Sequence, residues 1–416
     1  MFSNPTPRLL SSFITGDSVD EDVEVSNFDY AGINSILENN TLDALRNGER
    51  QPIGNVLLTG ATGFLGIHIL KELIDRDDVP VIWCLVRGEN DEKAERRLKS
   101  LLYYYFSKSY RELFGNRLRI VNGDVTQDFN VDGQVDTVFN CAAVVKHFSE
   151  GSEIEDVNVG GAQHCVDFCL RHNAKLIHVS TYSTAGLSIN GTPAEDTRYT
   201  EQMLYFGQYL TNQYIHSKFL SERIVLDAIA QHGLNGKVMR VGNLAPRSTD
   251  GEFQINFQTN SSMGRIRVFN MLGCYPYDMS DSPVEFSPID QTAKAIVTLA
   301  QTPKECCLFH PYNNHSVHFC DVMDELSQVD KAPVQVETDT FDQTLEEAKQ
   351  DPEKAKKLSS LLAYQDLAHG KRAAFIDADN QYTTQALYRL GFKWSSTSWD
   401  YVDRMLVTIG GFGFFD

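Results

Sequence analysis

The sequence predicts an α/β protein, built on a doubly wound parallel sheet and completed by a smaller, mostly helical C-terminal subdomain. Between residues 56 and 241, short runs that are apolar on both faces alternate with helical segments, as expected for strands covered by helices on both sides. A glycine-rich turn separates the first apolar run from the helix after it. After Asn243 the alternation stops, and the chain becomes rich in Asn, Ser, Gly and Met. The C-terminal region is therefore expected to be built differently.

Six apolar runs are the expected strands of the sheet, and helical segments join them. They are Val56–Leu58, Val81–Val86, Leu118–Val121, Thr137–Cys141, Leu176–Ser180 and Val238–Val241. The polar, acidic stretch of residues 1–50 is expected to contain one short helix, from about Tyr30 to Arg46. That stretch is either a lead-in packed on the body of the protein or the remnant of a linker.

The composition argues against several classes of protein. A hydrophobic content of 42% and a charged content of 22% are ordinary for a globular chain. No run of about 18 apolar residues is present to span a membrane. The net charge of −19 opposes binding to nucleic acid. The N-terminus does not resemble a signal peptide, and Cys165 and Cys169, on one helical face, are expected to pack rather than bind metal. We therefore expect reduced thiols, no metal and a cytoplasmic protein.

Three glycines, Gly60, Gly63 and Gly66, form the turn between the first strand and a helix whose apolar pattern begins at Phe64. Glycines allow a tight turn and a close approach of the backbone to phosphates, and the N-terminus of the helix supplies free N–H groups. The motif predicts a Rossmann-type cradle for the pyrophosphate of a dinucleotide. The spacing Gly-x-x-Gly-x-x-Gly favours the short-chain dehydrogenase branch of such folds. A purely structural glycine turn is the alternative.

The second strand ends in Arg87, where NAD-binding folds place an acidic residue for the ribose hydroxyl. A guanidinium suits a 2′-phosphate and gains little from a hydroxyl, so NADPH is the predicted cofactor. The alternative is that Arg87 is only a solvated loop residue, and Arg97 is either a second phosphate ligand or a charge on a helix surface. Asp124 follows the third strand as a candidate acceptor for the adenine amino group. The small side chains of Asn140–Ala143 would let the cofactor lie against the backbone.

Tyr214 and Lys218 lie four residues apart in a helical segment, so they share one face. A phenol is a weak acid, and a nearby ammonium makes it a better proton donor to an oxyanion. The same lysine can hold the ribose hydroxyls of a nicotinamide. Tyr104 and Lys108 repeat the spacing, but this copy precedes the third strand, in a helix far from the expected nicotinamide. We interpret that copy as surface or packing.

Thr181 ends the fifth strand and is the candidate second donor to the reacting oxygen, because such hydroxyls face the ligand crevice of an open α/β sheet. Ser180 and Ser183 are its rivals, and turn chemistry is the structural alternative. His147 and His216 have no spacing that supports a role as base. The sequence therefore predicts catalysis by Thr181 and the Tyr-Lys pair, with no covalent enzyme intermediate.

Seven motifs together resemble the thioester reductase domains that terminate nonribosomal peptide synthetases and carboxylic acid reductases, members of the extended short-chain dehydrogenases. The motifs are Thr-Gly-Ala-Thr-Gly-Phe-Leu-Gly (59–66), Leu-Val-Arg (85–87), Asn-Cys-Ala-Ala (140–143), Val-Ser-Thr (179–181), Tyr-x-x-x-Lys (214–218), Arg-Val-Gly-Asn-Leu (240–244) and Val-Glu-Phe-Ser-Pro-Ile-Asp (284–290). The resemblance implies NADPH-dependent reduction of an acyl or peptidyl thioester, held on a phosphopantetheine arm, to an aldehyde and in some members to the alcohol. It implies Thr181, Tyr214 and Lys218 as the catalytic residues.

The resemblance and the order along the sheet also imply a set of cofactor contacts. They are Thr59, Gly60, Thr62, Gly63, Phe64, Leu65, Gly66, Arg87, Arg97, Asp124, Val125, Ala142, Ala143, Val144, Asn158, Tyr214, Lys218, Gly242, Asn243 and Leu244. The implied partner is a phosphopantetheinyl carrier protein, and the chain is expected to be monomeric. Lys354, Lys356 and Lys357 are either a docking site for an acidic carrier or a solvated helix face.

The expected domain organisation follows from these motifs. Residues 1–50 are the lead-in, and 51–245 form the NADP-binding domain. Residues 284–312 return to that domain, with a strand at Val284–Phe286, a helix from Ser287 to Gln301 and a strand at Leu308–His310. Residues 246–283 and 313–416 form the substrate and carrier-binding subdomain, with a charged helical stretch from Phe341 to Leu362.

Three other functions fit parts of the sequence. A fatty acyl-CoA reductase would differ mainly in its substrate carrier. A sugar-nucleotide epimerase would keep NAD bound, for which an acidic residue at position 87 is expected. A non-catalytic NADP-sensing protein would need the glycine cradle but neither Tyr214 nor Lys218.

Overall fold

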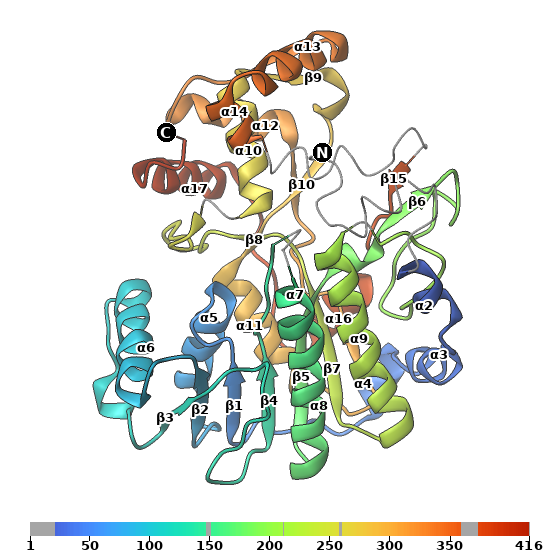
Figure 1. Ribbon diagram of the computed structural model, residues 1–416, viewed down its shortest axis with the longest axis vertical. Coiled ribbons are helices and arrows are strands. Elements are labelled where there is room, and N and C mark those ends of the chain that lie inside the picture. Colours follow the sequence, from blue (N-terminus) through green and yellow to red (C-terminus); the bar gives the residue numbers. More distant parts are fainter. Residues whose placement is uncertain (1–20, 147–150, 211, 258–259, 359–372, 416) are drawn as a thin grey trace. The chain divides into compact units, whose positions relative to one another are not determined.

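Seven parallel strands form the central sheet of the computed structural model (Figure 1), in the order β12-β7-β5-β4-β1-β2-β3. Their bounds are β1 Val56–Thr59, β2 Ile82–Val86, β3 Leu118–Asn122, β4 Thr137–Asn140, β5 Lys175–Thr181, β7 Gly236–Val241 and β12 Leu308–Phe309. All residues of β1, β2, β4 and β7 are buried, which explains why these runs lack a polar face. The predicted doubly wound α/β fold is confirmed.

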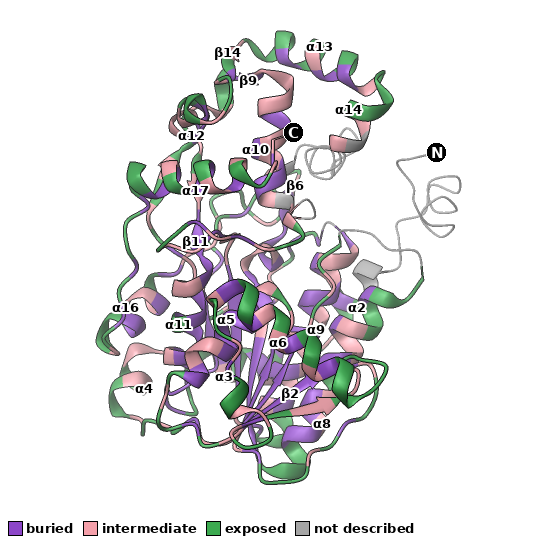
Figure 2. Ribbon diagram, turned by 90° about the vertical axis from the view of Figure 1, so that its left-hand side faces the viewer, coloured by how far each residue is buried: buried purple, intermediate pink, exposed green. Residues whose placement is uncertain are grey.

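Helices cover both faces of this sheet (Figures 1 and 2). The helices α5 (Phe64–Ile74) and α11 (Ile289–Leu299) lie on one side of it, and α8 (Gly161–His172) and α9 (Gln213–His232) on the other. The helix α6 (Asp91–Phe106) packs on β2 and β3. Strand order reverses between β1 and β4, so the carboxyl ends of these two strands flank the position at which such sheets bind ligands.

The structure describes residues 21–146, 151–210, 212–257, 260–358 and 373–415, and it divides the chain into two compact units. The first unit comprises Met1–Val241, Ala293–Pro311 and Gly370–Lys393, and the second comprises Gly242–Thr292, Tyr312–His369 and Trp394–Asp416. The division lies near the predicted boundary at residue 245. It differs from the prediction by giving Gly370–Lys393 to the first unit and residues 284–292 to the second.

The N-terminal segment forms three helices where one was predicted: α2 (Glu21–Asn27), α3 (Ala31–Glu38) and α4 (Leu42–Asn47). The predicted single helix is wrong because Thr41 caps a new helix by accepting a hydrogen bond from the N–H of Ala44. The side chain of Asn40 turns inward and donates to the carbonyls of Glu201 (2.9 Å) and Leu308 (2.7 Å). This part of the segment is therefore tied to the first unit.

A returning segment of the chain completes the first unit. β15 (Ala373–Phe375) pairs antiparallel with β6 (Leu187–Ile189), and α16 (Gln381–Arg389) packs on α4. The unit also contains the short elements α7 (Glu153–Glu155), a π-helical turn η2 (Asp156–Gly160) and the 3₁₀ turns η1 (Arg111–Leu113) and η3 (Tyr182–Ala185).

The second unit is built from helices and paired short strands. The helices are α10 (Ser261–Leu272), α12 (Phe319–Glu325), α13 (Thr338–Lys349), α14 (Pro352–Lys357) and α17 (Trp399–Gly411), with 3₁₀ turns η5 (Tyr277–Met279) and η6 (Leu326–Gln328). The strands pair as β8 (Leu244–Ala245) with β11 (Ser287–Pro288), β9 (Cys274–Pro276) with β14 (Val334–Val336), and β10 (Pro283–Glu285) with β13 (Ser316–His318). Its aromatic core includes Phe269, which packs on Phe319 and Phe341.

Two predicted elements differ from this arrangement. The expected strand at Val284–Phe286 does not join the central sheet, because β10 finds its partner in β13 of the second unit. The charged stretch from Phe341 is not one helix: α13 ends at Lys349, and Asp351 caps α14, whose first residue is Pro352. Residues 359–362 of that prediction lie outside the described ranges.

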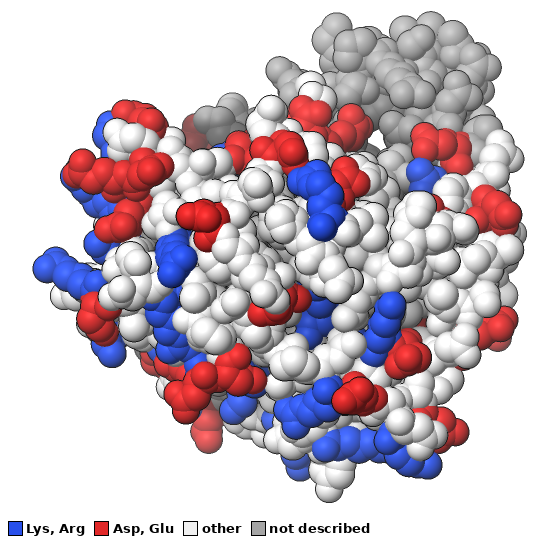
Figure 3. All heavy atoms as spheres, turned by 90° about the horizontal axis from the view of Figure 1, so that it is seen from below, with Lys and Arg blue, Asp and Glu red and all other residues white. Residues whose placement is uncertain are grey.

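On the face drawn in Figure 3, acidic and basic side chains are interspersed, so the net charge of −19 is not gathered there. All eight cysteines are free, and Cys165 and Cys169 are buried on α8. In the part of the chain that the structure covers, no helix is long and apolar enough to cross a membrane.

Candidate active site

A cavity of about 230 Å³ opens in the first unit beside the carboxyl ends of β1 to β4. Its lining includes the predicted cofactor contacts Thr59, Gly60, Thr62, Gly63, Arg87, Arg97, Asp124, Val125, Ala142, Ala143 and Val144. It also includes Cys141, from the predicted stretch Asn140–Ala143, together with Leu85, Gly123, Glu153 and Val157, which were not predicted as contacts. Leu85, Gly123 and Val157 lie within two positions of a predicted residue, whereas Glu153 of α7 carries no sequence signal. The predicted Phe64, Leu65 and Gly66 form the first turn of α5 and do not line the cavity.

The three glycines of the turn have different reasons to be glycine. Gly60 has a φ of +71°, and a Cβ there would lie 2.6 Å from the N atom of Ala142. A Cβ on Gly66 would lie 2.1 Å from the carbonyl oxygen of Gly60, so its absence lets α5 pack against the turn. Gly63 is exposed, lines the cavity, and a Cβ on it would meet only the Gly60 oxygen, at 3.3 Å. The absence of a side chain at Gly63 is therefore not needed for packing within the protein; it leaves space for a ligand in the cavity.

The N-terminus of α5 completes a cradle that fits a dinucleotide pyrophosphate. Its N-cap residue is Gly63, which has no side chain to cap the N–H groups of the first turn. These groups, with the positive end of the helix dipole, favour an anion. The residues present therefore fit the cofactor that the glycine motif predicts, with room at Gly63 and the start of a helix beside it.

Two guanidinium groups line the same cavity. Nη1 of Arg87 lies 3.6 Å from a carboxylate oxygen of Asp124, and the Arg87 side chain is 66% exposed. Nη1 of Arg97 donates to the carbonyl of Arg87 at 3.3 Å. An ion pair this exposed contributes little to stability. Both cations therefore have the freedom to engage a phosphate.

A buried row of polar side chains crosses three strands beneath the turn. Oγ1 of Thr59 donates to Asn140 (2.7 Å), and the amide of Asn140 lies 3.1 Å from Nδ1 of His178. The N–H of Ala142 reaches back to Oγ1 of Thr59 at 3.4 Å. Burial holds the pKa of His178 well below its usual value, so this imidazole is neutral. The row holds the strand ends from which the cavity is built.

Asn158 positions two segments rather than lining the cavity. From the η2 turn, its side chain accepts from the N–H of Val144 (2.8 Å) and donates to Oγ of Ser217 (2.9 Å) on α9. Ser217 in turn donates to the carbonyl of Tyr214 at 2.8 Å. The predicted cofactor contact thus lies between the loop after β4 and the first turn of α9.

The helix α9 carries the predicted Tyr-Lys pair. It begins where Asn212 caps it by accepting from the N–H of Ile215 (2.9 Å), so Tyr214 is in its first turn, half-buried against the core of the unit. Lys218 is 3% exposed, and its Nζ donates to the carbonyl of Val179 at 2.6 Å. Burial lowers the pKa of Lys218 to about 8, against the opposing effect of the Glu222 carboxylate.

Thr181 lies two residues beyond the carbonyl that Lys218 binds. It ends β5 and caps the η3 turn, its hydroxyl accepting from the N–H of Ser183 at 3.2 Å. α9 packs on both β5 and η3. The rival Ser180 has its hydroxyl committed to the carboxylate of Glu222. The structure therefore brings Thr181 and Lys218 to one strand end.

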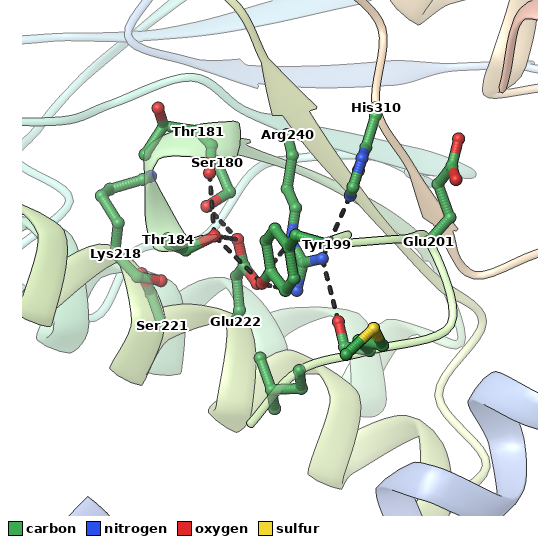
Figure 4. A network of polar contacts seen from close by, with 12 residues as sticks. Ser180, Thr181, Thr184, Tyr199, Glu201, Lys218, Ser221, Glu222, Arg240 and His310 are labelled. Carbon is green, nitrogen blue, oxygen red and sulfur yellow. Dashed lines mark hydrogen bonds and ion pairs between the residues drawn. The ribbon is translucent and has the colours of Figure 1, made fainter. Parts of the chain in front are cut away.

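A buried ionic network behind Thr181 was not predicted (Figure 4). Arg240 on β7 and Glu222 on α9 form an ion pair at 2.7 Å, with both side chains fully buried. The guanidinium also lies 4.1 Å from the ring centre of Tyr199 and 3.1 Å from Nε2 of His310. Two signals existed in the sequence: Glu222 lies one further helical turn beyond Lys218, and Arg240 opens one of the seven motifs.

The remaining predicted residues are not among those that line the cavity. Gly242, Asn243 and Leu244 belong to the second unit, where the N–H of Asn243 donates to Glu285 at 2.7 Å and Leu244 pairs with Ser287. Burial raises the pKa of Glu285 to about 7. The copy of the Tyr-Lys spacing is not wholly helical, because α6 ends before Lys108. His216 has a buried Nε2 without a partner in the described ranges, and His147 lies outside them.

The fold and the cradle define a class of protein: an α/β protein of the short-chain dehydrogenase type that binds a nicotinamide dinucleotide. Residues 58–296 match the NAD-binding family model described as "Male sterility protein", and the chain belongs to this family. More narrowly, it belongs to the terminal thioester reductase domains of the extended short-chain dehydrogenases, a family of oxidoreductases. The predicted resemblance is confirmed.

Three similar proteins illustrate the assignment. A thiolation-reductase di-domain from an archaeal non-ribosomal peptide synthetase is 33% identical with a TM-score of 0.86, over 100% of this chain and 87% of that one. The glycine betaine reductase ATRR of Emericella nidulans is 32% identical over 63% of this chain and 21% of its own length. The carboxylic acid reductase of Mycobacterium tuberculosis is 31% identical over 63% of this chain and 24% of its own. The chain spans only 6% to 25% of the length of the curated relatives that it matches best.

Proposed function

We propose that this chain uses NADPH to reduce an acyl or peptidyl thioester, carried on the phosphopantetheine arm of a carrier protein, to an aldehyde, with further reduction to the alcohol open to it. The observation that carries the proposal is the meeting of α9 and β5: Nζ of Lys218 donates to Val179, two residues before Thr181. This contact lies in the same unit as the glycine-lined cavity. The location of the proposed catalytic residues and of the cavity in one unit supports the proposal.

The preference for NADPH rests on the charge around the cavity. Arg87 and Arg97 would hold the 2′-phosphate, and the cradle at Gly63 would hold the pyrophosphate. Asp124 pairs with Arg87 at 3.6 Å, and a phosphate dianion would compete with that carboxylate for the guanidinium. When bound, NADPH supplies a hydride to the thioester carbonyl carbon.

The side chains of the chain would manage the oxygen and the sulfur. Thr181 and Tyr214 would donate hydrogen bonds to the carbonyl oxygen, an effect worth about 3 kcal/mol per donor in the transition state. Tyr214 would protonate that oxygen as the carbon is reduced, and the Lys218 ammonium would stabilise the phenolate left behind. Tyr214 would then take the proton back while the C–S bond breaks and the thiol leaves with a proton from water. The balance is one thioester, one hydride and one proton giving one aldehyde and one thiol.

A carrier protein is the partner that suits a thioester substrate. The proposal is supported by the thiolation-reductase arrangement of the similar archaeal protein. Lys354 and Lys357 lie on α14 of the second unit, and the Lys356 side chain lies outside the described part of the chain. The docking role of this basic cluster stays a prediction.

The test compares two tyrosines that share the same spacing to a lysine. Tyr214→Phe should lower NADPH consumption with an acyl-pantetheine thioester at least about 100-fold while leaving cofactor binding intact. Tyr104→Phe, on the exposed face of α6, is the matched control and should keep wild-type turnover. Unchanged turnover in Tyr214→Phe would remove this residue from the mechanism. A higher kcat/KM for acyl-CoA than for the carrier-bound substrate would favour a fatty acyl-CoA reductase.

A further inference from the structure

Helix α9 carries a third titratable residue on the face of Tyr214 and Lys218. Glu222 lies four residues beyond Lys218, one further turn along the helix. Its side chain is fully buried, as is that of its partner Arg240. Removing two charges from water is costly, and a well-packed apolar pair often serves stability as well or better. The retention of this pair beside the candidate active site calls for a role beyond packing.

The contacts of Glu222 lead to the strand end that carries Thr181. One carboxylate oxygen accepts from Nε (2.9 Å) and Nη2 (2.7 Å) of Arg240, and the other accepts from the hydroxyl of Ser180. Thr184 lies 3.4 Å from the second oxygen and donates to the carbonyl of Thr181 at 2.9 Å. The carboxylate therefore binds the residue before Thr181 and lies beside the residue that holds its carbonyl.

Lys218 and Glu222 together hold β5 against α9. Lys218 binds the carbonyl of Val179, and Glu222 binds the hydroxyl of Ser180, so two successive turns of the helix hold two successive residues of the strand. Figure 4 shows Lys218 and Thr181 at one end of this arrangement and Arg240 at the other, with Glu222 between. A shift of either contact would move the Thr181 hydroxyl relative to the helix.

Among the titratable groups that act on Lys218, Glu222 supplies the negative charge. Burial raises the pKa of the Cys141 thiol to about 12 and lowers that of the His178 imidazole, so both are neutral at pH 7. Glu222 is the carboxylate whose charge acts on the buried ammonium, opposing the effect of desolvation. Arg240 binds one oxygen of Glu222 and Ser180 binds the other, so the ion pair and the contact with the strand form together.

We propose that Glu222 is a positioning residue of the active site: through Ser180 it fixes the strand end that carries Thr181, and its negative charge stabilises the Lys218 ammonium. Arg240 is the buried counter-ion of this carboxylate. The inference rests on the proposed function for the roles of Thr181 and Lys218. It assigns to Glu222 the task of holding these two residues in position relative to one another.

The first experiment measures the charge of Lys218 in the full chain without cofactor. The ¹³Cε resonance of Lys218, assigned with Lys218→Arg, is titrated in wild type, Glu222→Gln and Glu201→Gln. Glu201 is the matched control because it is a buried carboxyl that accepts from the N–H of Thr383 (2.9 Å) and points away from the network in Figure 4. Glu222→Gln should lower the titration midpoint of Lys218 by about one pH unit, and Glu201→Gln should leave it in place. An unmoved midpoint in Glu222→Gln, or an equal shift in both variants, would overturn the charge role.

The second experiment tests the contact without removing the charge, and it decides the positioning role if Glu222→Gln does not fold. Ser180→Ala removes the hydroxyl that Glu222 accepts from, whereas Ser221→Ala removes a buried hydroxyl that bonds only to carbonyls of α9. Ser180→Ala should lower kcat about tenfold, with KM and the alkaline limb of the pH profile unchanged, and Ser221→Ala should keep wild-type kcat. A wild-type kcat in Ser180→Ala would overturn the inference. If the wild type reduces no thioester, the proposed function fails, while the Lys218 titration still judges the charge role.

Discussion

The carboxyl ends and the amino ends of the parallel strands form two opposite sides of the central sheet, here called its carboxyl edge and its amino edge. A buried lysine whose pKa is lowered to about 8 lies at each, yet only one of the two is at the candidate site. Lys218 is at the carboxyl edge, bound to Val179 of β5. Lys237 is at the amino edge, at the start of β7, and its Nζ donates to the carbonyls of Pro303 (2.7 Å) and Cys306 (2.9 Å). In both cases burial is the main cause of the shift.

The difference between these lysines lies in their partners. At the amino edge the ammonium closes a loop between α11 and β12 by satisfying two backbone carbonyls, which is a structural task. At the carboxyl edge the ammonium of Lys218 binds one carbonyl, that of Val179, in the strand end that leads to Thr181. The carboxylate of Glu222 lies one helical turn further along α9. A shifted pKa therefore marks burial, and only the surrounding groups distinguish an active-site lysine from a structural one.

The largest expected difference in turnover is between two variants in which one of these lysines is replaced by methionine. Lys218→Met should lower kcat about 100-fold or more, because the charge beside the proton donor is lost. Lys237→Met should keep kcat within about twofold but lower the free energy of unfolding by about 2 kcal/mol, since it leaves the Pro303 and Cys306 carbonyls without a donor. Turnover and denaturant unfolding measure both. An equal loss of turnover in the two variants would remove the distinction between the edges.

The glycine turn sharpens the description of the carboxyl edge. Gly63→Ala should fold as the wild type but weaken dinucleotide binding about tenfold, because its Cβ would point into the cavity and meet the protein only at 3.3 Å. Gly66→Ala should instead destabilise the fold, since its Cβ would lie 2.1 Å from the Gly60 oxygen. Cofactor titration and thermal unfolding separate these outcomes. Wild-type affinity in a folded Gly63→Ala would argue against a pyrophosphate at this turn.

A smaller effect tests which dinucleotide the carboxyl edge prefers. Arg87→Gln should reduce the ratio of kcat/KM for NADPH to that for NADH about tenfold, because the guanidinium gains only from the 2′-phosphate. Arg97→Gln is the matched control, and its reduction should be smaller, since Arg97 also donates to the Arg87 carbonyl. A ratio that neither variant changes would leave no basis for NADPH in this cavity.

The last effect is on stability rather than on turnover, and it concerns the pH dependence at the amino edge. Lys175 is 4% exposed, donates to the carbonyl of Pro52 (2.9 Å), and burial lowers its pKa to about 7. In the unfolded chain its pKa is about 10.4, so from pH 7 to pH 9 the unfolded state keeps a proton that the folded state has lost. Stability relative to Lys175→Met should therefore rise with pH, by at most about 1.4 kcal/mol per pH unit. Denaturant unfolding at pH 7, 8 and 9 measures the slope, and a difference that shrinks as pH rises would contradict the account.

The central sheet was predictable because its strands are buried on both faces. The runs at β1, β2, β4 and β7 have no polar side to confuse with a helix or a loop. The prediction of a single N-terminal helix was wrong because it overlooked Asn40 and Thr41. These residues favour a break in a helix, since their side chains form hydrogen bonds with backbone groups. The strand near Val284 was placed in the wrong sheet because a run of three residues can pair with the edge of either sheet, and the choice of β13 as partner is not local.

The candidate site was predictable as far as its motifs are local. The glycine turn, Arg87 and the Tyr-Lys pair are each set by a few neighbouring residues, and the structure brings the turn and Arg87 to one cavity. The pairing of Glu222 with Arg240 joins a helix to a strand across the fold, so spacing alone does not reveal it. The same is true of the row from Thr59 to His178, whose members lie on three strands.

The most direct test of the central claim follows a hydride. The chain is incubated with NADPH carrying two deuterium atoms at C4 of the nicotinamide and with an acyl-pantetheine thioester, and the products are identified by mass spectrometry. The account predicts an aldehyde with one deuterium on the former carbonyl carbon, present before any alcohol, and free pantetheine thiol in equal amount. Release of the unlabelled carboxylic acid, or an unchanged thioester beside a folded protein with NADPH bound, would contradict it.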